Sequence, residues 1–489
     1  MKILFVSSEL FPFAKTGGLA DVVFSLANEL SLMGHEVKIV LPRYSSINAE
    51  NFEKVDGILK IKAANGDAQC SLYKTILPSS NNVEVYFIEH EGCFALRQGI
   101  YGNKNEKDFF DNPYRFTLLS RGAFEVCNFL NWIPDIIHCH DWSSSLSAVL
   151  LKYVYRYENF SNTASVLTIH NLGYQGIYPL EKFTDLGIDW GLYYKAGFDY
   201  KDRFNFLKAG IICADELTTV SPTYAEEIQT QDYGFGLNEF LYQRSSCLTG
   251  ILNGEDKKIW NPETDSLIPF NYSKDNLENK AKCKKVLQKQ FGLAPEEKVP
   301  LVGLVMRLAD QKGINELYAP GYGCFSKMCE DLNAQFVIVG SGEAWCENAI
   351  KNLCAKYSNV RAMIGYEEKL SHLVEAGSDL FLLPSKYEPC GLNQIYSMAY
   401  GTLPIVRKTG GLADTVNNFD EKNNLGTGFV FDLLSPSSIY HTVEWAVDTY
   451  LNKQSCFKAL QQRAMSSSFT WENSAKQYVE VYKKALNSI

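Results

Sequence analysis

Short apolar runs separated by helical or polar segments recur along the chain, and this pattern predicts an α/β fold. Residues 3–7 form an apolar run typical of a buried strand, and residues 22–33 carry apolar side chains at helical spacing up to Gly34. Residues 36–42 form a second strand-like run. Because two parallel strands joined by a helix make a βαβ unit, we expect the chain to begin with one.

The same alternation continues through the first half of the chain. Further strand-like runs occupy residues 134–138, 165–170 and 216–221, and helical segments begin after Trp142 and at Pro222. Alternating strands and helices favour a parallel sheet with helices on both faces. The first half is therefore predicted to be a doubly wound α/β domain.

Polar residues interrupt this rhythm over residues 254–297, which we interpret as a connector. A second series of strand-like runs follows, at residues 301–306, 336–339, 379–384 and 402–406. The sequence thus predicts an α/β protein with two Rossmann-like doubly wound domains, at residues 1–250 and 251–465.

Residues 466–489 are predicted to form a final helix that Thr470 can cap. Its apolar positions recur at steps of four and three and comprise Trp471, Ala475, Tyr478, Tyr482, Ala485 and Ile489. One apolar stripe of this kind indicates a helix that packs on a domain surface, and we expect it to dock on the first domain.

Length and charge agree with this architecture and exclude some functions. The chain has 489 residues, whereas a single hydrophobic core stops growing at about 250–300 residues, so two domains are expected. Lys and Arg number 47 against 56 Asp and Glu, a net charge of −9, which disfavours a nucleic-acid partner. No apolar run reaches the roughly 18 residues of a membrane span, and Glu9 interrupts the apolar N-terminus, so we expect neither a membrane partner nor a signal peptide.

The thirteen cysteines include no C-x-x-C pair, so neither a zinc ribbon nor a thioredoxin-type redox motif is indicated. A chain of this length builds a core without disulfide bridges. We therefore expect reduced thiols and a cytoplasmic protein.

Candidate chemistry gathers where the strand-like runs end, which is where open parallel sheets bind ligands. The residues concerned are Lys15, Gly17 and Gly18 after the first run, Arg307 and Lys312 after 301–306, Glu388, Cys390 and Gly391 after 379–384, and Gly410 and Gly411 after 402–406. Cations and exposed backbone amides from two domains suit a phosphorylated ligand. Taken singly, each has an ordinary alternative: a solvated lysine, a turn, or an Arg307–Asp310 ion pair.

Other ligand classes find less support. A dinucleotide-binding loop has the pattern G-x-G-x-x-G, but after Gly340 and Gly342 the third glycine position is occupied by Trp345. No Walker A motif occurs either. His138 and His140 would face one side of a strand, but further metal ligands cannot be named, so hydrogen-bonded imidazoles at a packed strand end are the better interpretation. No Asp-x-Asp pair is present either. We therefore expect no metal and no cofactor.

The segment from Glu388 is predicted to open a helix, with Pro389 in its first turn and Gly401 at its end. Cys390 at such a helix start could be an activated thiolate, but no base can be assigned to it. A sugar or phosphate contact at these amides is the preferred hypothesis.

These motifs resemble the signatures of the bacterial glycogen synthase and plant starch synthase family. The matching segments, in family order, are Lys15–Asp21, His138–Trp142, Thr168–Gly176, Val220–Ala225, Ile251–Gly254, Arg307–Gly313, Glu388–Leu392 and Thr409–Thr415. The resemblance implies the GT-B architecture, in which two Rossmann-like domains face each other across a cleft. It also implies a hexosyltransferase that moves glucose from ADP-glucose, with retention, to the non-reducing end of an α-1,4-glucan.

Carried over by motif, the resemblance implies a role for each matching position. Lys15, Arg307 and Lys312 would grip the diphosphate, and His170 would lie near the transferred glucose. Glu388 would contact sugar hydroxyls. The remaining substrate-binding candidates are Gly17, Gly18, Asp21, Asn253, Cys390, Gly391, Leu392, Gly410 and Gly411. The family also suggests that aromatic residues within 108–115 help to seat the glucan, although core packing accounts equally well for Phe109 and Phe110.

Three alternatives remain open at this stage. The donor could be UDP-glucose, since no motif identifies the base. The chain could also be a relative that binds glucan or nucleotide without catalysis. Glu388 could act either as a nucleophile or as a sugar ligand, and we favour the ligand role in a front-face mechanism.

Overall fold

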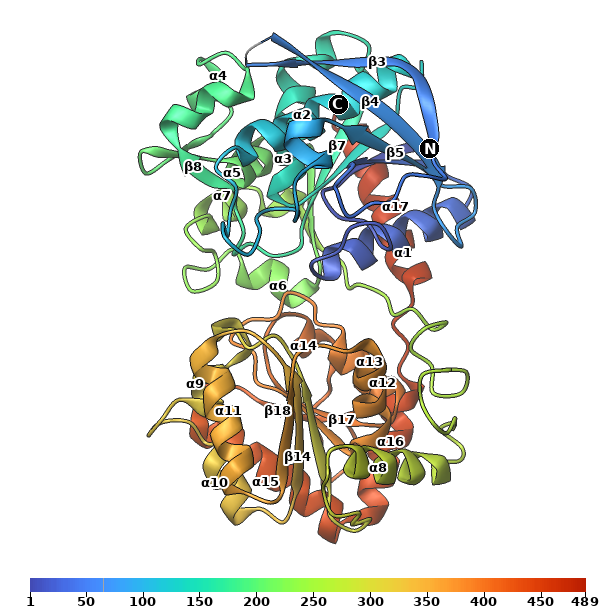
Figure 1. Cartoon of the computed structure of the whole chain (residues 1–489), viewed down its shortest axis with the longest axis vertical. Helices are drawn as coiled ribbons and strands as arrows, with labels where there is room; N and C mark the ends of the chain where they lie inside the picture. Colours follow the sequence, from blue (N-terminus) through green and yellow to red (C-terminus); the bar gives the residue numbers. More distant parts are fainter. Residues whose placement is uncertain (65) are drawn as a thin grey trace. The chain divides into compact units, whose positions relative to one another are not determined.

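The computed structural model describes residues 1–64 and 66–489, and the chain divides into two compact units (Figure 1). The first unit comprises Met1–Val220, Ala225–Ile251 and Trp471–Ile489. The second comprises Ser221–Tyr224 and Leu252–Thr470. Each unit contains its own main sheet, and the two units are described separately.

The first unit is built on a nine-stranded sheet in the order β12-β11-β7-β6-β1-β2-β5-β4-β3. Its strands are β1 (Lys2–Val6), β2 (Glu36–Pro42), β3 (Glu53–Ala63), β4 (Gly66–Ile76), β5 (Glu84–Glu89), β6 (Ile136–His140), β7 (Ala164–Ile169), β11 (Glu216–Thr219) and β12 (Leu248–Gly250). All neighbours are parallel except β3–β4 and β4–β5, which are antiparallel. A separate three-stranded sheet contains β8 (Ile177–Pro179), β9 (Asp199–Tyr200) and β10 (Arg203–Asn205).

Helices cover both faces of this sheet. They include α1 (Gly18–Leu32), α2 (Asn112–Phe129), α3 (Trp142–Tyr153) and α17 (Trp471–Asn487). The other helices of this part of the chain are α4 (Leu192–Lys195), α5 (Phe206–Cys213), α6 (Pro222–Glu227) and α7 (Asn238–Gln243). The final helix α17 lies against α1, β7 and β11, while α2 packs with α3 and α3 with α5 (Figure 1). The predicted stripe of α17 is buried except for Ile489, which lies beyond the helix and is exposed.

The second unit contains an all-parallel sheet in the order β15-β14-β13-β16-β17-β18. Its strands are β13 (Leu301–Val305), β14 (Gln335–Gly340), β15 (Val360–Ile364), β16 (Leu380–Leu383), β17 (Leu403–Arg407) and β18 (Phe429–Phe431). Its helices are α8 (Glu278–Gln290), α9 (Ile314–Tyr318), α10 (Phe325–Asp331), α11 (Ala344–Lys356), α12 (Glu368–Gly377), α13 (Asn393–Ala399), α14 (Gly410–Thr415), α15 (Pro436–Asn452) and α16 (Gln454–Ser466). Helices α9, α10 and α11 lie on one face, and α8, α12 and α13 on the other (Figure 1).

The predicted strands form in both units. They could be recognised from the sequence because strands buried on both faces are continuous apolar runs. The predicted βαβ unit forms, with β1 and β2 parallel and Gly34 ending the helix at φ 86°. The helix boundary near Glu388 is wrong: α13 begins at Asn393 with Leu392 as its N-cap, so Pro389 lies in the preceding loop. Gly401 ends that helix region at φ 66° as expected.

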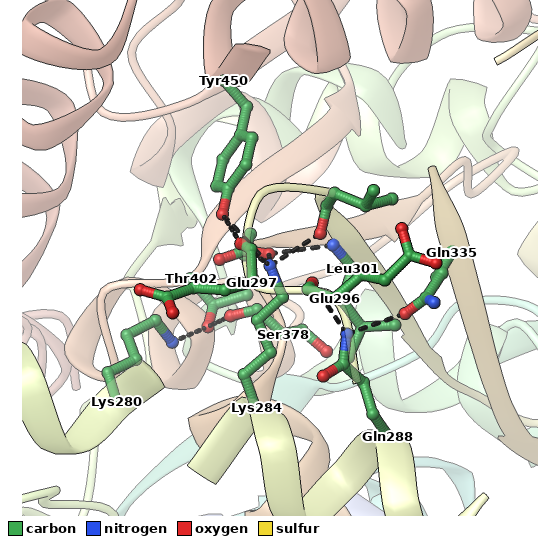
Figure 2. Close-up of polar contacts among 12 residues, drawn as sticks. Lys280, Lys284, Gln288, Glu296, Glu297, Leu301, Gln335, Ser378, Thr402 and Tyr450 are labelled. Atoms are coloured by element: carbon green, nitrogen blue, oxygen red, sulfur yellow. Dashed lines mark hydrogen bonds and ion pairs between the residues drawn. The ribbon is translucent and has the colours of Figure 1, made fainter. Parts of the chain in front are cut away.

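The predicted connector at residues 254–297 is also incomplete, because it contains helix α8. This helix buries polar side chains at four-residue spacing, Lys280, Lys284 and Gln288. Figure 2 shows that these side chains end on polar atoms of residues from other segments, among them Thr402, Glu297 and Gln335. Because only Cys283 and Leu287 of its buried residues are apolar, the apolar spacing that signals a helix is weak in the sequence.

The ammonium groups of the two lysines each have several acceptors. Lys280 Nζ donates to Thr402 Oγ1 at 2.7 Å and to the Ala376 carbonyl at 3.1 Å. Lys284 Nζ lies 2.7 Å from a carboxylate oxygen of Asp379. Buried ammonium groups of this kind are stable only when hydrogen-bonded, so α8 is fixed to the sheet by directional contacts.

Candidate functional site

In the first unit, the loop after β1 is organised by a buried carboxylate that the sequence analysis did not select. Glu9 is 3% exposed and accepts hydrogen bonds from the amide and hydroxyl of Thr16, at 2.6 and 2.7 Å, and from the Gly17 amide at 3.2 Å. Tyr101 donates to the same carboxylate at 2.8 Å. The sequence contains one sign of this role, because Glu9 is a charged residue shortly after an apolar strand. From the sequence alone, we interpret it only as evidence against a signal peptide.

This loop presents Lys15 at the surface of the unit. Its ammonium lies 2.8 Å from the Asp21 carboxylate, with nearly half of the lysine side chain exposed. A Cβ added at Gly17 or Gly18 would meet no heavy atom of residues 1–64 and 66–489 within 4 Å. Thr16 borders a cavity of about 540 Å³ that is also lined by residues 99–105. Protein packing therefore does not require glycine here, and the loop leaves open space beside α1.

His170 follows β7 in the same unit and belongs to a cluster of histidines. Its Nε2 lies 3.1 Å from Nδ1 of His140, and its backbone amide donates to Asp141 at 2.7 Å. Burial lowers the pKa of His170 to about 3 and holds the pKa of His140 well below its usual value. Burial raises the pKa of Asp141 to about 7, against the opposing effect of the amide hydrogen bonds. The imidazoles are therefore neutral near pH 7.

The predicted packed strand end at His138 and His140 is confirmed. His138 Nε2 lies 2.6 Å from the Thr168 hydroxyl, and its Nδ1 lies 2.9 Å from the Tyr482 hydroxyl on α17. The two imidazole rings lie 4.2 Å apart. Within residues 1–64 and 66–489, no group of three His, Cys, Asp or Glu side chains is arranged to hold a metal ion.

In the second unit, three loops meet beyond the ends of the neighbouring strands β13, β16 and β17. Lys312 Nζ lies 2.5 Å from Glu388 Oε2, and the Ser385 hydroxyl donates to the same oxygen at 2.7 Å. Arg307 is exposed, and its guanidinium reaches Gln311 Oε1 at 3.5 Å. Asp310 pairs with Lys386 at 2.6 Å, so its carboxylate has a lysine partner in place of the arginine considered above.

Glycines allow these three loops to pack closely. Gly313 has φ 73°, and a Cβ there would lie 2.1 Å from the Pro384 carbonyl. A Cβ at Gly410 would lie 2.0 Å from the Glu388 carbonyl, and one at Gly411 would lie 1.9 Å from the Cys390 carbonyl. The Gly411 amide donates to the Glu388 carbonyl at 3.0 Å. Gly411 therefore allows the two backbones to approach closely, and its amide holds the Glu388 loop.

Cys390 and Asn253 lie together beside this loop. Burial raises the pKa of the Cys390 thiol to about 12, although the Asn253 backbone amide hydrogen-bonds to it. Gly391 has φ 70°, which turns the chain into Leu392. A thiol with this pKa is protonated near neutral pH, which argues against the thiolate nucleophile.

The aromatic segment at 108–115 divides into a core part and an exposed part. Phe109 is 3% exposed and lies 4.9 Å from the fully buried guanidinium of Arg115. Phe110 is 63% exposed, lines a cavity of about 630 Å³, and lies 3.8 Å from the Lys182 ammonium. Core packing therefore accounts for Phe109 and leaves Phe110 available to a ligand.

The candidates are divided between the two units. The first unit holds Lys15, Gly17, Gly18 and Asp21 after β1 and His170 after β7. The second unit holds Asn253, Arg307, Lys312, Glu388, Cys390, Gly391, Leu392, Gly410 and Gly411. Glu9, Asp141 and Ser385 were missed, because buried polar side chains that hold loops carry no motif of their own. No described helix combines the length and the apolar character needed to cross a bilayer.

Comparison with known proteins agrees with this geometry. Residues 2–243 match the starch synthase catalytic domain family, and residues 287–462 match the glycosyl transferases group 1 family. The chain is 51% identical over 486 residues to a glycogen synthase of Treponema denticola, covering 99% of both chains. It is 43% identical to glycogen synthase 1 of Geobacter sulfurreducens, covering 99% of this chain and 96% of the relative.

Solved structures show the same relationship. The catalytic domain of starch synthase IV from Arabidopsis thaliana, bound to ADP and acarbose, superposes with a TM-score of 0.89 at 32% identity and 99% coverage of both chains. The predicted fold, two Rossmann-like domains of the GT-B type, is confirmed by this likeness. The chain belongs to the glycogen synthase and starch synthase family of glycosyltransferases.

Proposed function

We propose that the protein is a glycogen synthase that transfers glucose from ADP-glucose to the non-reducing end of an α-1,4-glucan, with retention and without a metal ion. The observation that carries this proposal is the Lys312–Glu388 pair, held at adjacent strand ends in a chain 51% identical to a glycogen synthase over its full length. The ADP bound in the starch synthase IV structure supports ADP-glucose over UDP-glucose.

The two units take different parts in this proposal. Residues 1–250 would bind the acceptor glucan, residues 251–465 the nucleotide sugar, and the final segment 466–489 would complete the first domain. Its helix α17 packs on α1 and β7, which supports that assignment. Exposed Phe110 gives the acceptor an aromatic surface on the first unit.

The diphosphate would be held by cations from both units, Lys15, Arg307 and Lys312. Gly17 and Gly18 leave space for a ligand beside Lys15 and Asp21, and this supports a contact there. His170 would face the transferred glucose. Glu388 would bind sugar hydroxyls, with Cys390, Gly391, Leu392, Asn253, Gly410 and Gly411 shaping the pocket around it.

The chemistry explains why fixed cations are needed. When the bond between glucose C1 and the phosphate oxygen breaks, positive charge develops on the sugar and negative charge on the leaving diphosphate. Preorganised cations stabilise that negative charge without a metal. The acceptor O4 then bonds to C1 on the same face, and its proton passes to the departing phosphate. Glu388 is a sugar ligand in this front-face mechanism.

The donor assay tests the proposal directly. Purified full-length chain is incubated with glycogen and labelled ADP-glucose or UDP-glucose, and polymer-bound label is counted with and without EDTA. We expect incorporation from ADP-glucose that EDTA does not change. Preference for UDP-glucose would revise the donor, and no incorporation from either donor would favour a binding relative without catalysis.

Variants test the cationic residues. We expect Lys312→Ala and Arg307→Ala to stay folded and to lose about 10²–10³ in rate, the usual cost of one such group. Lys356→Ala is the matched control, because Lys356 also pairs with a glutamate, at 3.1 Å, but at an exposed site. Near-normal turnover of Lys312→Ala would remove that residue from the mechanism.

Glu388→Gln separates the two roles of the carboxylate. A glutamine can still bind sugar hydroxyls but cannot form a covalent glycosyl intermediate. Substantial remaining activity would support the ligand role, whereas complete loss with a folded protein would favour a nucleophile.

We further propose a cytoplasmic location. In support, all thirteen cysteines are free thiols in the structure, and ten of them are buried. Fractionation of the host cell would test this location.

A further inference from the structure

Two neutral imidazoles face each other at the His170 site, and only one of them can donate. His140 Nδ1 and His170 Nε2 lie 3.1 Å apart, which is hydrogen-bonding distance. A neutral imidazole carries one proton on one of its two nitrogens, and the partner of the other nitrogen decides which tautomer is present. The surroundings of His140 therefore determine the tautomer of His170.

The second nitrogen of His140 identifies the donor. His140 is fully buried, and its Nε2 has no hydrogen-bond partner among the described residues. A buried N–H without an acceptor costs about 1–3 kcal/mol and is rare in folded proteins. The proton of His140 is therefore better placed on Nδ1, from which it donates to His170 Nε2. His170 then carries its own proton on Nδ1.

The ring of His140 is held in this position from several sides. Its centroid lies 5.0 Å from that of Phe5 and 4.2 Å from that of His138. His138 is fixed in turn by hydrogen bonds to the Tyr482 and Thr168 hydroxyls. Since all these contacts are within the first unit, the final helix supports the His140 ring through His138.

We propose that His140 is a positioning residue that fixes His170 as the Nδ1–H tautomer, so that His170 offers a hydrogen-bond donor to the transferred sugar. Although most of His170 is buried, the residue keeps some exposed surface, and its Nε2 faces His140. The nitrogen left to meet a ligand is thus Nδ1. This inference rests on the proposed function only in assigning the sugar as that ligand.

The tautomer is measured without any activity assay. In full-length protein with ¹⁵N-labelled histidine, long-range ¹H–¹⁵N correlation distinguishes protonated Nδ1 from protonated Nε2, and His170→Gln assigns the His170 signals. We expect His170 to be protonated at Nδ1 at pH 7. Protonation at Nε2 would overturn the proposal, even if the enzyme proves to be fully active.

Two substitutions of His140 test the consequence for catalysis. The amide of asparagine reproduces the Nδ1–H donor, while leucine removes it. We expect His140→Leu to lower kcat about 10- to 100-fold, as a displaced reacting group does, with a smaller effect on donor KM. His140→Asn is expected to retain most of kcat. Equal losses in both variants, or a normal kcat in His140→Leu, would contradict the proposal.

The remaining outcomes are also informative. If His140→Leu does not fold, the tautomer of the wild-type protein and the rate of His140→Asn still decide the matter. His372→Asn is the control for loss of a buried imidazole, because His372 lies in the second unit and pairs with Asp265 at 2.8 Å. We expect it to change kcat by less than His140→Leu. Absence of glucosyl transfer in the wild type would refute the proposed function, and the NMR result would stand by itself.

Discussion

Lys280 provides a test of how the second unit is stabilised, because its ammonium is buried and no carboxylate of the described residues is within hydrogen-bonding contact of it. Its acceptors are the Thr402 hydroxyl and two backbone carbonyls, at 2.7–3.4 Å. Burial lowers the pKa of Lys280 from 10.5 to about 8. The folded protein therefore releases this proton more easily than the unfolded chain does.

The sign of the pH effect follows from proton binding. Between pH 8 and 10.5 the unfolded chain binds the proton and the folded chain does not, so stability rises with pH across this window. Below pH 8 both states are charged, and folding carries the cost of burying the ammonium. The full lowering corresponds to about 3 kcal/mol, of which about 2 kcal/mol is recovered between pH 7 and 9.5.

Lys280→Met removes the titrating group and keeps an aliphatic chain of similar length. We expect the stability of the wild type relative to this variant to rise by about 2 kcal/mol from pH 7 to pH 9.5. Urea unfolding followed by circular dichroism measures the difference at each pH. Lys285→Met, at an exposed position of α8, controls for methionine in this helix. A difference that does not change with pH would refute the argument.

Four further substitutions distinguish the purposes of individual residues. Gly18→Ala should leave the melting temperature unchanged or slightly raised, because the added Cβ meets no described atom within 4 Å. The same methyl group would occupy the space proposed for the ligand, so the donor KM in the glucosyl-transfer assay should increase. Gly411→Ala should lower stability by about 1–3 kcal/mol, since its Cβ would lie 1.9 Å from the Cys390 carbonyl. Thermal unfolding measures the stability of both glycine variants. Tyr482→Phe should cost about 1 kcal/mol in urea unfolding, from loss of its hydrogen bond to an imidazole. Because the pKa of Asp141 is raised to about 7, the wild type should lose stability relative to Asp141→Asn as pH rises from 4 to 7, measured by urea titration.

The strand ends were predictable because both sheets are mostly parallel and buried on both faces. Each apolar run is then continuous, and the residue that follows it lies at the ligand-binding edge. The antiparallel strands β3 and β4 were not predicted, because their burial alternates at the sheet edge and gives no continuous run. Helix α8 was missed for the related reason that its buried face carries Lys280, Lys284 and Gln288.

The limits of a motif are clearest where the chain repeats one. The heptapeptide KTGGLAD occurs at residues 15–21 and again at 408–414, each time after a strand. In the first copy Gly17 is the N-cap, with extended φ −156°, and α1 begins at Gly18. In the second copy Thr409 is the N-cap, and α14 begins one position earlier, at Gly410 with φ 43°.

Because the seven residues are identical, the difference must come from their surroundings. Buried Glu9 binds the amides of the first copy and leaves its glycines in open space. In the second copy, the carbonyls of Glu388 and Cys390 lie so close to the two glycines that a Cβ at either glycine would clash with them. Tertiary contacts thus give one sequence two backbone conformations. The motif locates a strand end in both units, but only the packing around it decides whether its glycines make room for a ligand or for the protein's own backbone.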